Sequence, residues 1–82
     1  MTIDDDKAIA LVLAQRLETR AQLQDIDAML NKLFEIPPAN IPDPATTKEE
    51  MRTLLREIRN DTASQDRIVK FIRIAKTLLG EA

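Results

Sequence analysis

The chain has 82 residues and carries 12 Lys and Arg against 14 Asp and Glu, which gives a net charge of −2 at pH 7. This length suffices for one domain, spanning residues 1–82, and is too short for two. Cys, His, Trp and Tyr are all absent, which excludes disulfides, thiolate zinc sites and the most common catalytic base. We therefore expect a protein that is not an enzyme and that uses no metal or cofactor.

The start of the chain lacks the features of a targeting signal. Residues 1–6 are acidic, whereas a secretory signal has a basic start and a transit peptide is rich in Arg. The strongest apolar run, residues 8–14, is far shorter than the roughly 20 residues that cross a bilayer. These features predict a cytoplasmic protein that does not enter a membrane.

Proline and glycine divide the chain into two helical parts. All four Pro lie between Pro37 and Pro44, the single Gly is Gly80, and strong helix formers dominate the rest. No segment alternates as a strand would. The sequence therefore predicts an all-α protein. It has one helix over about 5–35, capped by the acidic residues 4–6, then an extended Pro-rich connection over 36–45 and a helical segment over about 46–79.

The first predicted helix has two apolar faces. At 100° per residue, one face gathers small and large apolar residues, namely Ala10, Leu13, Ala14, Leu17, Ala21 and Ala28. The nearly opposite face gathers Leu11, Val12, Ile26, Met29, Leu30 and Leu33. Because a surface helix needs only one apolar face, the second face indicates another neighbour. We expect the Ala-rich face to form a self-association interface and the other face to form the intramolecular core.

The second helical segment begins with one clear apolar face, formed by Met51, Leu54, Leu55 and Ile58. The polar residues 60–65 indicate either a break near 60–62 or the middle of one long helix. Since the two helical parts match in length, the simplest architecture is a long helical hairpin that pairs with a second copy as a four-helix bundle. A compact three-helix fold with a turn at residues 60–62 is the alternative.

Basic residues concentrate in the second half of the chain. Residues 1–45 hold four basic and eight acidic side chains, whereas residues 46–82 hold eight basic and six acidic ones. The eight basic residues are Lys48, Arg52, Arg56, Arg59, Arg67, Lys70, Arg73 and Lys76. They form either a solvated surface or a polyanion-binding site within a helix-turn-helix outline. The solvated surface is favoured, because acidic residues interrupt the set and no aromatic residues are interleaved for base stacking.

Together these patterns predict a non-catalytic helical protein–protein interaction module, such as an adaptor, a chaperone-like partner or a regulatory subunit. The two-faced first helix predicts a homo-oligomer, with a dimer favoured over larger assemblies, and a second protein is the other partner considered. A small nucleic-acid-binding regulator that uses the basic C-terminal helices is the alternative function.

Overall fold

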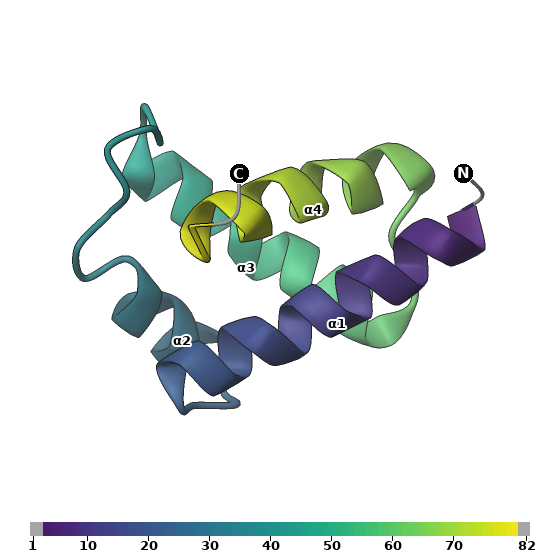
Figure 1. The fold of residues 1–82 in the computed structure, drawn as a ribbon, viewed down its shortest axis with the longest axis horizontal. Helices are drawn as coiled ribbons and strands as arrows, with labels where there is room; N and C mark the ends of the chain where they lie inside the picture. The colour runs from purple at the N-terminus through teal and green to yellow at the C-terminus, as the bar shows by residue number, and fades with distance from the viewer. Residues whose placement is uncertain (1–2, 81–82) are drawn as a thin grey trace.

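Four helices make up the computed structural model, which describes residues 3–80 (Figure 1). They are α1 (Ile3–Ala21), α2 (Ile26–Leu33), α3 (Pro44–Asn60) and α4 (Gln65–Leu78). No strand occurs within residues 3–80, so the predicted all-α class is confirmed. The helices pack into one globule that measures 33 × 24 × 20 Å. No helix in this part of the chain combines the length and hydropathy that crossing a membrane requires.

The predicted helix over residues 5–35 is wrong, because the chain breaks between α1 and α2. Gln22 adopts a left-handed conformation with φ 59°, and the Leu23 amide donates to the Glu18 carbonyl at 3.3 Å. This is the bond that closes a Schellman-type helix end. Asp25 then caps α2, since its side chain accepts a hydrogen bond from the Ala28 amide at 2.9 Å. A terminator and a cap within four residues therefore stop one helix and start the next.

The Pro-rich connection ends earlier than predicted. Helix α3 begins at Pro44, where the fixed φ of proline suits the first helical position. The cap of α3 is Asp43. Its carboxylate accepts from the Thr46 amide at 3.3 Å and from the Thr46 hydroxyl at 2.8 Å.

Of the two alternatives for residues 60–65, a break or the middle of one long helix, the structure has the break. Asp61 takes a left-handed conformation with φ 58°, and the Thr62 amide donates to the Glu57 carbonyl at 2.9 Å. A four-residue link therefore joins α3 to α4. All four helices of the globule come from one chain. This corrects the predicted long hairpin, which needed a second copy to complete a four-helix bundle.

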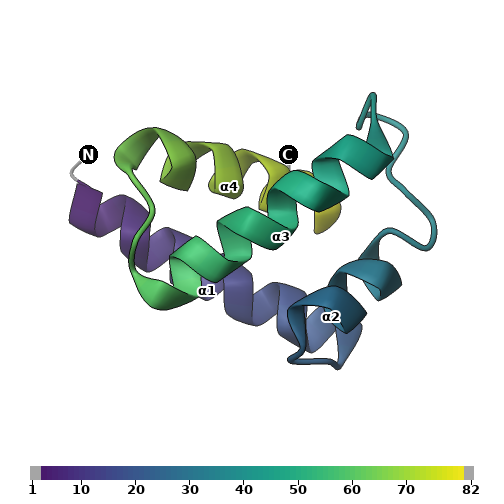
Figure 2. The same cartoon turned by 180° about the vertical axis from the view of Figure 1, so that it is seen from behind.

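The first and last helices run in the same direction. Near their starts the Gln65 side chain donates to Asp6, and near their ends the Arg20 guanidinium donates to the Leu79 carbonyl at 3.4 Å. Helix α3 crosses them in the opposite direction, in front of them in the view of Figure 2, and α2 packs against the end of α1. The core lies where α1, α3 and α4 meet, with α2 closing one end.

The Ala-rich face of the first helix is corrected from an external interface to the intramolecular core. The buried residues of α1 are Ala10, Leu13, Ala14, Leu17 and Ala21. They pack with large side chains from the other helices, such as Met51, Leu55 and Phe71. Small alanines allow helices to approach closely, which explains why this side of α1 receives its neighbours. Ala28 lies on α2 and is half-buried, so it no longer shares a helix with the others.

Candidate protein-binding surface

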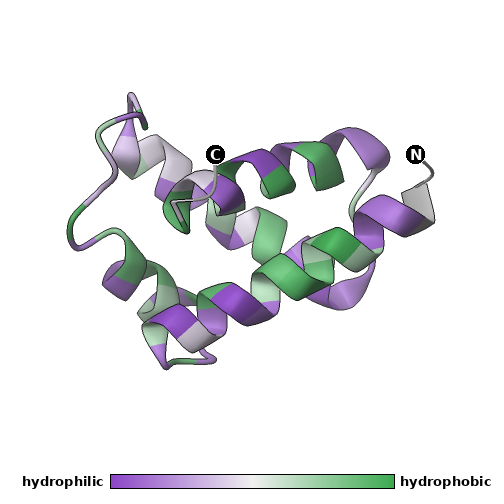
Figure 3. Ribbon diagram, in the orientation of Figure 1, coloured by the Kyte–Doolittle hydropathy of each residue, from purple (hydrophilic) through white to green (hydrophobic). Residues whose placement is uncertain are grey.

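One stretch of α1 is apolar on every side. Residues 8–14 form an unbroken apolar run, which appears as a green band across the middle of α1 in Figure 3. On the side away from the core, Ile9 is 37%, Leu11 49% and Val12 54% exposed. Ala8 is exposed beside them. We call Ala8, Ile9, Leu11 and Val12 the α1 outer patch. A helix that is apolar all round is ordinarily covered on all sides, and here one side is uncovered.

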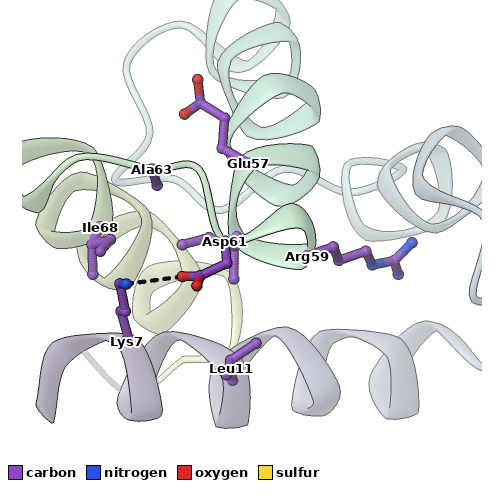
Figure 4. Close-up of a pocket in the computed structure, with 8 residues that line it drawn as sticks. Lys7, Leu11, Glu57, Arg59, Asp61, Ala63 and Ile68 are labelled. Atoms are coloured by element: carbon purple, nitrogen blue, oxygen red, sulfur yellow. Dashed lines mark ion pairs between the residues drawn. The ribbon is translucent and has the colours of Figure 1, made fainter. Parts of the chain in front are cut away.

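A hollow of about 310 Å³ borders the patch at Leu11 (Figure 4). Leu11 points into it from α1, and the end of α3, the α3–α4 link and the start of α4 form its other walls. The apolar part of the lining comprises Leu11, Ile58, Ala63 and Ile68. Lys7 and Asp61 point toward each other at one edge and form an ion pair at 3.0 Å.

The charged side chains around this hollow are paired with each other or with neighbours. Besides the Lys7–Asp61 pair, Arg59 turns away from the hollow and pairs with Glu18 at 2.7 Å. Glu57 accepts a hydrogen bond from the Arg67 guanidinium at 2.5 Å. Every carboxylate that lines the hollow is thus held by a Lys or Arg. The hollow therefore suits an apolar side chain from a partner better than it suits proton transfer.

A second, shallower groove borders the patch on its other side. It lies between α1 and α4, has a volume of about 350 Å³, and is lined by Ala8, Ile9, Val12, Leu13, Arg16 and Lys76. Its floor is apolar and its two charged residues are both basic. The outer patch therefore forms a ridge with an apolar depression on each side, and the groove toward α4 has a positive rim.

Four of the eight predicted polyanion-binding residues form ion pairs instead. On one flank of α3, Arg52 pairs with Asp27 of α2 at 2.5 Å, and Arg59 pairs with Glu18 of α1. Arg52 also pairs with Glu49 at 2.5 Å. Hydrogen bonds to Glu49 and then to Asp27 raise the pKa of the Arg52 guanidinium above its ordinary value.

On the other flank of α3 the charges are reversed, with acidic residues on α3 and basic residues on its neighbour. Glu57 and Glu50 of α3 pair with Arg67 and Lys70 of α4. Helix α3 therefore presents basic residues to α1 and α2 and acidic residues to α4. This arrangement favours one order of helices around α3, because exchanging the neighbours would oppose like charges.

The remaining four basic residues are Lys48, Arg56, Arg73 and Lys76. They form no ion pair within residues 3–80. Arg73 lines a depression beside Asn40 and Thr47, whereas Lys76 lines the groove beside α1. The two α4 residues therefore border different depressions, and the structure does not bring the predicted set together as one positive surface.

Other kinds of site are not supported by geometry. No group of three or more Asp or Glu side chains within residues 3–80 is arranged to hold a metal ion. Comparison of the chain with protein-family models, with curated proteins and with solved structures found no match.

Proposed function

We propose that this chain is a non-catalytic protein-binding module, acting as an adaptor, a chaperone-like partner or a regulatory subunit, and that it docks its partner on the α1 outer patch. The observation that carries the proposal is the joint exposure of Ile9, Leu11 and Val12 on a helix whose opposite side is core. Fully burying one such side chain contributes about 1.5–3 kcal/mol. Covering these three half-exposed residues would therefore contribute on the order of 3 kcal/mol to binding.

The flanking depressions add to this proposal. A partner that covers the ridge can place apolar side chains into the hollow at Leu11 and into the groove at Ile9 and Val12. Binding sites of this kind combine an apolar centre with a polar rim. The absence of His, Cys and Tyr from the chain and the ion pairing of the carboxylates around the hollow favour binding over catalysis.

The proposal is tested with two variants that each add one negative charge to an exposed helical position. Val12→Glu places the charge in the patch, and Thr53→Glu places it on α3, away from the patch. Wild type and Thr53→Glu are expected to exceed the mass of a single chain in light scattering or to retain a protein from lysate of the source cell. Val12→Glu is expected to do neither. A wild-type chain that stays single and retains nothing would contradict the proposal.

The alternative is a small nucleic-acid-binding regulator, which the α3–link–α4 segment favours by its helix-turn-helix outline. The ion pairs of Arg52, Arg59, Arg67 and Lys70 weigh against it, because they neutralise half of the basic set. Salt-dependent retention on DNA that disappears in an Arg56→Ala, Arg73→Ala double variant would favour the alternative over protein binding.

A further inference from the structure

We infer that the partner on the α1 outer patch is a second copy of this chain, with the two α1 helices antiparallel about a twofold axis near Ala10. This inference rests on the proposed function, since it names the occupant of the same surface. Its support is the distribution of charge around the patch. An apolar centre lies between an acidic end at Asp5 and a basic end at Arg16.

The two charged ends lie on the same edge of the helix. Asp5 and Arg16 are 11 residues apart. At 100° per residue this separation equals three full turns plus about 20°, so the two residues lie on nearly the same side of the helix. Along the helix axis they are about 16 Å apart. A twofold axis perpendicular to α1 keeps each edge of one helix beside the same edge of the other. Asp5 of one copy therefore faces Arg16 of its partner, and the contact occurs twice.

The groove between α1 and α4 adds a second basic residue to the contact between Asp5 and Arg16. Lys76 lies in the same groove as Arg16, so the partner's Asp5 would meet two cations. Lys76 forms no ion pair within residues 3–80, whereas Asp5 and Arg16 also interact within their own chain. A parallel pair about a twofold axis along the helices would instead place Asp5 and Arg16 of the two copies on opposite edges of the contact, so neither Asp5 would meet an Arg16. Charge therefore distinguishes the antiparallel arrangement from the parallel one.

The apolar centre is also self-complementary. Ala8 and Val12 point away from the core on the same side of α1 and lie symmetrically about residue 10. In the antiparallel arrangement Ala8 of one helix faces Val12 of the other, and a small residue opposite a larger one allows the two surfaces to interdigitate. Leu11 and Ile9 extend the contact toward the two depressions.

Charge reversal tests the inference. Asp5→Arg and Arg16→Glu each convert both intermolecular contacts from attraction to repulsion. We expect each variant alone to dimerise about tenfold more weakly than wild type, which corresponds to about 1.4 kcal/mol, because two exposed attractive contacts become repulsive. An equimolar mixture is expected to recover dimers that contain one copy of each, because opposite charges then face each other at both contacts. Native mass spectrometry distinguishes this mixed dimer by its mass.

The Asp5→Arg, Arg16→Glu double variant is the internal control. It restores opposite charges within one sequence and is expected to dimerise on its own, with a urea midpoint that reports whether its fold is retained. Single variants that dimerise like wild type, or a mixture that forms no mixed dimer, would overturn the antiparallel pairing. A wild-type chain that stays single up to hundreds of micromolar, yet retains another protein through Val12, would overturn self-association and leave the proposed function standing. If it also retained nothing, both would fail.

Discussion

Asp6 is the one buried charged side chain within the described part of the protein, and changing it to Asn is expected to stabilise the fold. The side chain is 3% exposed, and one of its oxygens, Oδ2, accepts a hydrogen bond from Nε2 of Gln65. The other oxygen, Oδ1, and the Gln65 Oε1 atom are both buried without a hydrogen-bond partner. Both unpaired acceptors therefore belong to the two hydrogen-bonded side chains that join α1 to α4, and neither has a donor.

An Asn at position 6 has the shape of Asp but presents one acceptor and two donor hydrogens. Its oxygen can keep the bond from Gln65 while its Nδ2 donates to Gln65 Oε1, so that the two amides form a cyclic pair. An unsatisfied buried group costs about 1–3 kcal/mol. The loss of a negative charge in the first turns of α1 removes about 0.3–1 kcal/mol of favourable interaction with the helix dipole. We expect a net gain of about 1–2 kcal/mol in the free energy of unfolding.

Urea unfolding followed by far-UV circular dichroism measures this gain. A two-state chain of this size should also show a melting temperature raised by roughly 5–10 °C. Asp6→Leu is the matched control, because it removes the charge without supplying a donor and leaves Gln65 with no partner. We expect it to be less stable than Asp6→Asn by more than 1 kcal/mol, on the order of one lost buried hydrogen bond. If Asp6→Asn is no more stable than wild type, the unpaired acceptors do not destabilise the fold.

Three further predictions concern the helix ends and one ion pair. Asp25→Ala removes the cap of α2 and should lower the free energy of unfolding by about 0.5–2 kcal/mol; an unchanged urea midpoint would contradict the capping role. Gln22→Gly removes the steric cost of the left-handed backbone and should raise the free energy of unfolding by about 0.5–1 kcal/mol. A lower urea midpoint would show that the Gln22 side chain stabilises the fold by more than its backbone conformation costs. Arg52→Ala should lower the urea midpoint at 0.01 M salt, with a smaller difference at 1 M, where the Debye length falls from about 30 Å to about 3 Å. A loss that is equal at both salt concentrations would point to packing and not to charge.

The parts of the fold that the sequence predicted are those marked by strong local signals. The four prolines locate the connection before α3, whereas the polar residues 60–65 allowed either a break or a continuous helix, and the structure has the break. The break before α2 was missed because residues 22–24 contain neither Gly nor Pro, and long polar residues are acceptable within a helix. Asp25 was the available signal, since an Asp before an apolar run is typical of a cap.

The candidate surface could be predicted only in part from local sequence patterns. Helical periodicity separated Ala10, Leu13 and Leu17 from Leu11 and Val12 correctly, but it could not say which set faces the core. That choice depends on where α3 and α4 pack. Likewise, the basic residues of α3 could be grouped on one flank from their spacing. Their partners Glu18 and Asp27 lie 41 and 25 residues away from Arg59 and Arg52, so their pairing depends on the tertiary fold.

The parallel packing of α1 on α4 has a consequence for how the protein forms. The contacts at both ends of this helix pair join residues 59 positions apart, Asp6 with Gln65 and Arg20 with Leu79. During synthesis the first helix therefore leaves the ribosome long before the helix that covers it. Until α4 follows, the side of α1 that packs against α4 stays exposed, and the core cannot close from local contacts alone. The last residues of α4 thus decide when the whole chain becomes stable, and shortening this helix should leave α1 as an aggregation-prone segment.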